Sequence, residues 1–372
     1  MKFTINKIDI VDVLSKVQGI TGRRSNLAIT ECIRIKASDT HVQLTATDLE
    51  TCFEGTFPAI VETPGAIALS ARKLYEIVRE FPSTDILIDE VENRWINIGN
   101  QKVHYHLMGM NADDYPETPL FESVEFFEIP AAILKTMIDK SIVISGIGED
   151  KKPHINGALF ERHALQTPAC IRMVSTDGGR LSTFEWITPA DTKIPDGPNV
   201  LIPKKGLHEV SKFLDSSGNV QVGIYANYFI IKHASETLAM RMMEGQFPKY
   251  NEVIFREGGH DIQIERDPLN NMLKRMSILC TDSYRAAFFT FDDGLLTINA
   301  TNPDIGESKE DMVIDYSGEK MVAAFNPRFF IDALNGLNDE KVVLNILTKE
   351  KPCIVSGSAD KSYLNAIMPM KV

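Results

Sequence analysis

Apolar and polar positions repeat in the same order three times along the chain. In the first block, residues 10–17 place apolar side chains at the i, i+3, i+4 and i+7 spacing of one helical face. A strand-like run at 41–45 follows, and a second helical stripe covers 74–81 until Pro82 ends it. Residues 86–88 then resume a strand. The pattern predicts helix, strands, helix, strands within one block.

The later blocks carry the same signatures. Ala46-Thr-Asp48, Ser175-Thr-Asp177 and Ala300-Thr-Asn302 each follow an apolar run and lie about 125 to 130 residues apart. The second helical stripe begins at equivalent places, 70–74, 203–207 and 326–330. This period exceeds the ~20–50 residues of a solenoid repeat and has the size of a whole domain. We infer one domain, copied three times.

The ends of the blocks are marked by aromatic-proline pairs. Tyr115-Pro116 and Phe247-Pro248 each follow a strand and precede a polar connector. We therefore predict domains at 1–124, 125–257 and 258–372. Each should combine two helices with antiparallel sheets, which makes the fold class α+β.

Composition narrows the class of protein. The 372 residues are 44% hydrophobic and 24% charged, as in a globular chain. The net charge of −12 argues against a protein coated in basic residues, but clustered basic residues could still bind nucleic acid. The N-terminus has no apolar signal-peptide core, and no run could span a bilayer. Five dispersed cysteines favour buried free thiols in a reducing cytoplasm over a disulfide framework or zinc site.

Two columns of charge recur on the second helix of each block. A basic column and an acidic column align across the copies: Arg72, Lys205 and Arg328, then Glu76, Glu209 and Asp332. For any single helix, a solvated face of mixed charge explains such residues. A basic residue at the same place in all three copies also suggests that the copies face one shared object.

Motifs for catalysis are missing from the sequence. It has no phosphate-binding G-x-x-x-x-G-K-[ST] loop, no G-x-S-x-G elbow and no H-E-x-x-H. Gly146-Ile-Gly148 lacks the required spacing. His104 and His106 alternate on a predicted strand, where a strand surface explains them better than a metal pair. The loop from Thr176 to Leu181 fits either a nucleotide loop or a strand followed by a glycine turn.

Taken in order, short pieces of sequence carry a resemblance along nearly the full length. They are Met1-Lys-Phe3, Leu44-Thr-Ala-Thr-Asp-Leu-Glu50, Ala71-Arg-Lys73, Asn156-Gly157, Thr176-Asp-Gly178, Arg180-Leu181, Phe247-Pro248 with Tyr250, Phe325-Asn326 and Met368-Pro-Met370. In this order and at these distances, the chain resembles the bacterial DNA polymerase III beta subunits, the sliding clamps. The resemblance implies three DNA-clamp domains and a head-to-tail homodimer that closes six domains into a ring around double-stranded DNA. It implies no catalysis and no cofactor.

Simple geometry agrees with the implied ring. Twelve helices spaced ~10 Å apart give a circumference of ~120 Å and a diameter of ~38 Å between opposite axes. Subtracting a helix diameter of ~10 Å leaves ~28 Å, wider than a duplex of roughly 20 Å. Such a ring would hold DNA without reading its bases, and an acidic exterior would disfavour DNA on the wrong face.

By resemblance, basic residues would face the DNA. They are Arg24, Arg72, Lys73, Arg79, Lys151, Lys152, Lys204, Lys205, Lys274 and Arg275. Beside Lys152, Pro153-His154 stand where the family carries a pair of tyrosines.

The resemblance also implies a surface cleft for a short, mostly apolar peptide carried by the DNA polymerase III alpha subunit, the clamp loader and other clamp-motif proteins. Its expected lining is Ile155, Thr176, Gly178, Gly179, Arg180, Leu181, Pro248, Val253, Asn326, Phe329, Ile367, Met368, Pro369 and Met370. Methionine and isoleucine suit a cleft that accepts several ligands. The chain departs from the family at Gly179, where histidine is common, at Glu252, where arginine is frequent, and at its Lys371-Val372 end.

The implied contact between subunits pairs Tyr105 and Leu107 with Ile278 and Leu279, with Lys73 close to Asp304 or Glu307. Two other functions stay open at this point. One is a duplicate clamp that serves repair or drug resistance. The other is a nucleotide-hydrolysing enzyme built on the 176–181 loop.

Overall fold

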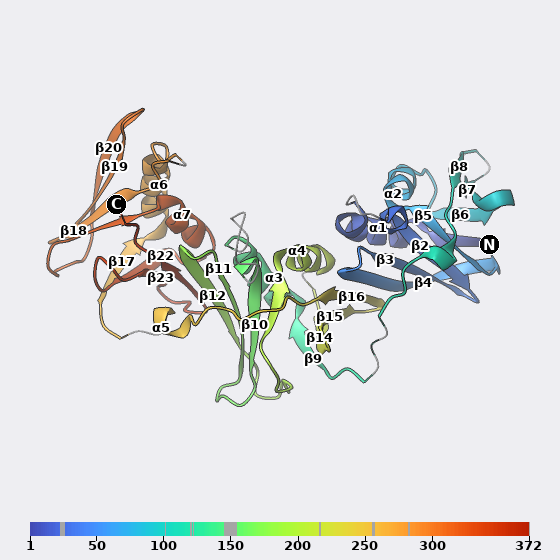
Figure 1. Cartoon of the computed structure of the whole chain (residues 1–372), viewed down its shortest axis with the longest axis horizontal. Helices are drawn as coiled ribbons and strands as arrows, with labels where there is room; N and C mark the ends of the chain where they lie inside the picture. The colour runs from blue at the N-terminus through green and yellow to red at the C-terminus, as the bar shows by residue number, and fades with distance from the viewer. Residues whose placement is uncertain are drawn as a thin grey trace. The chain divides into compact units, whose positions relative to one another are not determined.

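Three copies of one arrangement make up the chain (Figure 1). The computed structural model describes residues 1–22, 27–100, 102–119, 121, 123–144, 155–215, 217–254, 257–281 and 283–371. Each copy runs strand, helix, four strands, helix, three strands. The predicted α+β class with antiparallel sheets is confirmed, and so is the threefold repeat.

The first block contains two helices and eight strands. Its elements are β1 (Lys2–Asn6), α1 (Lys7–Thr21), β2 (Cys32–Ser38), β3 (His41–Thr47), β4 (Thr51–Thr63), β5 (Gly65–Ser70), α2 (Ala71–Arg79), β6 (Asp85–Glu90), β7 (Trp95–Gly99) and β8 (His104–Met108). Three short 3-10 helices are η1 (Ala28–Glu31), η2 (Glu92–Arg94) and η3 (Ala112–Asp114).

The second and third blocks repeat that order. The second contains β9 (Phe126–Pro130), α3 (Ala131–Ile142), β10 (Gly157–His163), β11 (Cys170–Thr176), β12 (Arg180–Ile187), β13 (Val200–Pro203), α4 (Lys204–Phe213), β14 (Asn219–Tyr225), β15 (Tyr228–His233) and β16 (Glu236–Arg241). After the short helix α5 (Asn251–Ile254), the third contains β17 (His260–Glu265), α6 (Arg266–Ser277), β18 (Ala287–Asp292), β19 (Leu295–Asn302), β20 (Gly306–Val313), β21 (Met321–Phe325), α7 (Pro327–Asn335), β22 (Lys341–Ile346), β23 (Cys353–Gly357) and β24 (Tyr363–Ile367).

Apolar stripes on the helices form the cores, as their spacing predicts. Ile10, Val13, Leu14 and Val17 of α1 are fully buried, and so are Leu269, Met272 and Leu273 of α6. Polar caps fix where the second helices begin: the Ser70 hydroxyl accepts from the Lys73 N–H, and the Asn326 side chain accepts from the Arg328 N–H. All five cysteines are buried and free, and burial raises the pKa of Cys52 to about 12.

The aligned acidic residues of the second helices, Glu76, Glu209 and Asp332, are not all exposed to solvent. Glu209 on α4 is 4% exposed, which corrects the expectation that this position is exposed in every copy. Its carboxylate lies against Gly19 of α1, where an added Cβ would come within 2.2 Å of the Glu209 oxygens. Glu209 therefore needs a residue without a side chain at position 19.

The chain divides into two compact units, and the second block is shared between them. One comprises Met1–Lys135 and Lys205–Met243, and the other comprises Thr136–Lys204 and Glu244–Val372. The first unit holds a twelve-stranded sheet in the order β8-β7-β6-β1-β4-β16-β15-β14-β9, with β3, β2 and β5 extending from β4. The second holds an eight-stranded sheet, β13-β10-β11-β12-β24-β23-β22-β17, and a four-stranded sheet, β20-β19-β18-β21.

The same strand pairing joins successive blocks inside each unit. The fourth strand of block one, β4, pairs antiparallel with the last strand of block two, β16, with Thr51 opposite Met240. The fourth strand of block two, β12, pairs with the last strand of block three, β24, with Arg180 opposite Ile367. Thr51 and Arg180 are the first residues of their strands, so the two junctions have the same register.

Candidate partner-binding site

The junction between blocks two and three is built around the β11–β12 hairpin. Thr176 ends β11, Gly178 adopts a φ of +85°, and Arg180 begins β12. The Asp177 carboxylate accepts the N–H groups of Gly179 and Arg180, each at 3.0 Å. A strand followed by a glycine turn therefore describes this loop. The Asp177 carboxylate stabilises the turn through these two hydrogen bonds, so the aspartate has a structural role that needs no bound nucleotide.

Arg180 connects the hairpin to helix α7. Its side chain is 3% exposed and pairs with Asp177 at 3.1 Å and with Asp332 of α7 at 2.5 Å. The guanidinium also lies over the ring of Phe329, 4.4 Å from the ring centroid. Since a buried charge needs partners, these three contacts make Arg180 a structural residue that holds the two blocks together.

The C-terminal segment is fixed to both sides of this junction. The Met368 N–H donates to the Gly179 carbonyl at 2.9 Å, and the Met370 N–H donates to the Ala324 carbonyl at 2.7 Å. Met368 remains 37% exposed, whereas Ile367 is fully buried. The backbone is therefore held in place, while Met368 stays exposed and Met370 is half-buried.

An apolar cluster lies beside the hairpin. It combines residues from both blocks and from the connector between them: Leu159, Val174, Leu181, Tyr250, Ile254, Ile354 and Ala366, with Phe247, Val253 and Leu364 packed against them. Leu181 is only 6% exposed. This site is therefore a packed apolar surface with partly exposed edges, and Leu181 forms part of its base.

A buried polar network holds the connector against this cluster. The Tyr250 hydroxyl donates to Glu161 and accepts from Arg172 at 3.1 Å. Arg172 also donates to Glu185 at 2.9 Å. Burial, followed by the hydrogen bond to Glu161, raises the pKa of Tyr250 well above its usual range. Tyr250 thus fixes the segment that contributes Val253 to the cluster.

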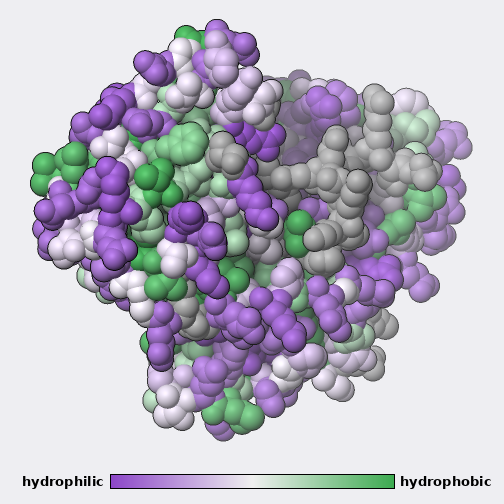
Figure 2. Space-filling view, turned by 60° about the vertical axis from the view of Figure 1, so that its left-hand side comes forward, coloured by the Kyte–Doolittle hydropathy of each residue, from purple (hydrophilic) through white to green (hydrophobic). Residues whose placement is uncertain are grey.

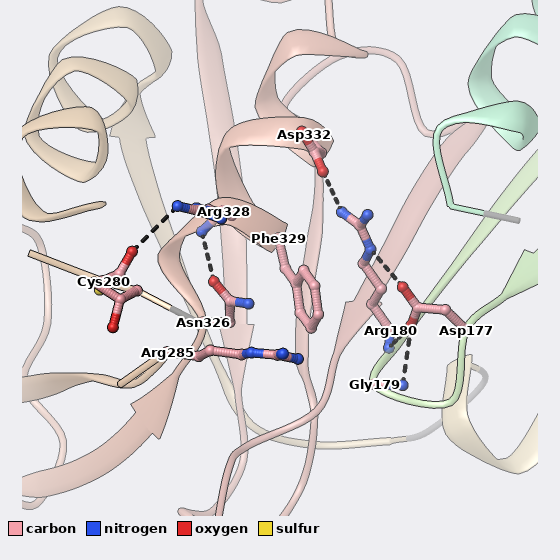
Figure 3. A pocket seen from close by; sticks show the side chains of 10 residues that line it. Asp177, Gly179, Arg180, Cys280, Arg285, Asn326, Arg328, Phe329 and Asp332 are labelled. Carbon is pink, nitrogen blue, oxygen red and sulfur yellow. Dashed lines mark hydrogen bonds and ion pairs between the residues drawn. The ribbon is translucent and has the colours of Figure 1, made fainter. Parts of the chain in front are cut away.

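A pocket of about 490 Å³ opens next to the cluster (Figure 3). Gly179 and Arg180 line it from the hairpin, and Asn326 and Phe329 line it from α7. Arg285 extends beneath the Phe329 ring in the view of Figure 3. An added Cβ at Gly179 would lie 3.1 Å from the Phe329 ring, so glycine here leaves that ring its space.

Three sequence models match the chain, one after another. They describe the N-terminal, central and C-terminal domains of the DNA polymerase III beta subunit and match residues 1–119, 128–249 and 251–371. The chain belongs to the DNA polymerase III beta subunit family. The resemblance inferred from short pieces of sequence is thus confirmed.

Relatives of this beta subunit match along its whole length. The beta sliding clamps of Escherichia coli K12 and Chlamydia pneumoniae are each 27% identical, covering 100% of this chain and 100% and 99% of their own. Among solved structures, the DNA polymerase sliding clamp of Bacillus subtilis superposes with a TM-score of 0.91 at 25% identity, covering 100% of this chain and 99% of that one. A sliding clamp from Bartonella birtlesii, solved with griselimycin, gives 0.92 at 26% identity with full coverage of both chains.

The expected cleft residues of this beta subunit come from three segments that meet at the junction. The hairpin contributes Thr176 and its neighbours, the connector contributes Pro248 and Val253, and the C-terminal segment continues from Ile367 to Met370. Gly179, Arg180, Asn326 and Phe329 line the 490 Å³ pocket. Ile155 is half-buried just before β10. Their role in binding a partner stays a prediction.

The basic residues expected to face DNA have different surroundings. Arg72 and Lys73 are exposed on α2 and both pair with Glu76, at 3.0 and 2.8 Å. Lys205 on α4 pairs with Asp48. Arg79 and Lys274 are exposed, the former beside Glu80, and Lys204 is half-buried. Arg275 pairs with Glu310. Three further candidates lie outside the described residues: Arg24, Lys151 and Lys152. Burial lowers the pKa of Lys204.

Several residues at the site escaped the sequence analysis. Cys280, Thr281, Arg285, Arg328 and Asp332 also line the pocket. Arg328 and Asp332 occupy repeated helix positions in the sequence, but no local signal links Asp332 to Arg180, which lies 152 residues earlier. Among the described residues, no helix is both long and apolar enough to cross a lipid bilayer.

Proposed function

We propose that this protein is a DNA sliding clamp, a ring of two chains that encircles duplex DNA and tethers the replicative polymerase. Membership in the beta subunit family supports this function, and so do relatives named beta sliding clamp. The clamp would act by binding alone, without catalysis or a cofactor. Its partners would be the DNA polymerase III alpha subunit, the clamp loader and other clamp-motif proteins, and it would work in the cytoplasm.

The repeated junction is the observation that carries the proposal. The fourth strand of one block pairs with the last strand of the next at both junctions inside the chain. Within the described residues, two strands of this kind have one edge without a partner: β20, the fourth strand of block three, and β8, the last strand of block one. A third junction of this kind, between β8 of one chain and β20 of another, would form twice in a dimer and close a head-to-tail ring.

The register of that third junction follows from the other two. Gly306 is the first residue of β20, as Thr51 is the first residue of β4. In the last strand of each block, Leu107, Met240 and Ile367 hold equivalent positions, because each pairs with an equivalent residue of the preceding strand. Gly306 of one chain would therefore lie opposite Leu107 of the other. Exposed apolar residues support the contact: Ile278 is 74% and Tyr105 is 40% exposed. Leu279 and Leu107 are half-buried.

DNA would be held by exposed basic residues without base contacts. Arg72, Lys73, Arg79, Lys274 and Arg275 are exposed on the first or second helix of their blocks. Most pair with a neighbouring carboxylate, which limits the attraction that each offers to phosphate. Arg24, Lys151, Lys152, Lys204 and Lys205 remain further candidates.

We predict that the free protein binds a linear duplex weakly and without sequence preference. Few phosphate contacts and a net charge of −12 should give a dissociation constant no tighter than the ~10⁻⁴–10⁻⁶ M of non-specific binding. Fluorescence anisotropy with labelled duplexes of different sequence, at several salt concentrations, would measure it. Tight binding to one sequence would contradict the proposal.

A partner peptide would bind at the junction of blocks two and three. The apolar cluster offers a surface for apolar peptide residues, and Met368 and Met370 can adapt to more than one ligand. The face that Figure 2 shows is mostly hydrophilic, with hydrophobic residues scattered over it. A duplicate clamp for repair or drug resistance would use the same site.

A further inference from the structure

The two junctions inside the chain differ at one pair of equivalent positions. At the first junction, Lys205 of α4 forms an ion pair with Asp48, the residue after β3. At the second, the equivalent residues are Arg328 of α7 and Asp177, the residue after β11. Between these two described side chains no ion pair forms, since Asp177 pairs with Arg180 and Arg328 donates to the Cys280 carbonyl at 3.1 Å.

This difference leaves a pocket open at the second junction. Asp177 and Arg328 both line the 490 Å³ pocket instead of closing it. We call it the arginine pocket, after Arg180, Arg285 and Arg328 in its lining. Arg180 is the buried member, held by two carboxylates. Arg285 and Arg328 are both exposed.

The three arginines and Phe329 line the same pocket. Arg180 covers one face of Phe329, and Arg285 extends beneath the same ring (Figure 3). Arg328 is the neighbour of Phe329 on α7, and its guanidinium reaches toward the Cys280 carbonyl. The lining side chains carry three positive charges and two negative ones, in a chain whose net charge is −12. An anion is therefore the ligand that the charge favours.

We propose that the arginine pocket binds an acidic side chain of the partner peptide, next to the peptide's apolar residues. The inference rests on the proposed function, because it needs a peptide at the apolar cluster. The two sites are continuous: Leu181 of the cluster and Gly179 of the pocket are two residues apart on one hairpin. At ~3.3 Å per residue, a peptide residue two or three positions from an apolar one can reach the pocket.

A carboxylate suits this pocket better than the DNA backbone does. Guanidinium groups bind carboxylates through paired, charge-assisted hydrogen bonds. Asp177 and Asp332 in the lining would repel a chain of phosphates, whereas a single carboxylate is small enough to bind at Arg285 and Arg328 alone. Arg180 already has its own carboxylates and would act as support rather than as a direct ligand.

The test compares matched acidic and neutral peptides. The probe is a labelled peptide with the short, mostly apolar clamp-binding segment of the DNA polymerase III alpha subunit of the same organism. A glutamate is placed in turn at each of three positions on either side of its apolar residues, and each version is matched by a glutamine. At low salt we expect at least one glutamate peptide to bind roughly five- to tenfold more tightly than its glutamine match, with the difference shrinking as salt rises.

The variants Arg285→Gln and Arg328→Gln should remove that preference and leave the affinity for the glutamine peptide unchanged. Arg241→Gln, at an exposed arginine on β16 outside the proposed sites, is the matched control and should keep the preference. Thermal unfolding of each variant checks that the fold is intact. Arg285→Gln leaves the hydrogen bond between Arg328 and Cys280 in place, so it tests the pocket even if Arg328→Gln destabilises α7.

Three outcomes would overturn the inference. Equal binding of every glutamate and glutamine pair would show that no acidic side chain is recognised. A preference that survives both arginine variants would place recognition elsewhere. Loss of duplex DNA binding in these variants, with peptide preference intact, would make the pocket a phosphate contact. If no peptide bound the parent protein at all, the proposed cleft itself would fail, and that result is distinct from the other three.

Discussion

Replacing Ile278 and Leu279 with alanine is expected to convert the dimer into folded monomers. Both residues follow helix α6, whose Arg275 pairs with Glu310 of β20, and Ile278 is 74% exposed in the single chain. Buried apolar residues at the centre of an interface each contribute ~2 kcal/mol or more. Losing both should weaken dimerisation by at least roughly a hundredfold. Sedimentation at nanomolar to micromolar concentration would measure it.

The matched control for this experiment removes exposed apolar side chains elsewhere. Ile60→Ala with Ile187→Ala changes two residues that are 72% and 57% exposed and lie outside β8 and β20. The control should remain a dimer, and both variants should keep their far-ultraviolet circular dichroism. If the Ile278 and Leu279 variant stayed dimeric at nanomolar concentration, the proposed third junction would be wrong.

Loss of peptide binding is the second large effect that we expect. Met368→Ala with Met370→Ala removes one exposed and one half-buried side chain and keeps the backbone hydrogen bonds to Gly179 and Ala324. Thermal stability should change by less than about 1 kcal/mol, since these side chains lie at the surface. Affinity for a polymerase-derived peptide should fall at least roughly tenfold. Fluorescence polarisation would measure both variant and parent.

Leu181 is a poorer position for that test. It is 6% exposed within the apolar cluster, and truncating a buried leucine costs about 2–5 kcal/mol of stability. Val313→Ala with Val322→Ala, at exposed positions outside the cluster, is the matched control for the methionine variant. A methionine variant that bound the peptide as well as the parent would move the proposed cleft away from the C-terminal segment.

Much of the fold could be predicted because its signals are local. The stripe at Ile10, Val13 and Leu14 depends only on helical period, and those residues are buried as predicted. Repeated motifs such as Ala46-Thr-Asp48 and Ser175-Thr-Asp177 lie at the turn after the third strand of their blocks. A duplicated domain keeps such turns because the same strands must be joined in each copy.

What could not be predicted depends on pairing between distant residues. β4 and β16 pair residue by residue, although nothing in the sequence of either strand indicates which strand it pairs with. Glu161, Arg172 and Tyr250 are polar and would be expected at the surface, yet they satisfy one another in the interior. Arg285 could not be predicted for the same reason, since only the fold brings it into one pocket with Phe329.

On this proposal, the protein holds DNA by enclosing it. The most direct measurement loads the protein onto nicked circular DNA with its clamp loader, isolates the complex by gel filtration at moderate salt, and then linearises the DNA with a restriction enzyme. A closed ring with few phosphate contacts should stay on the circle and slide off once the ends are free. Equal retention on circular and linear DNA, or release from the intact circle at moderate salt, would contradict the account.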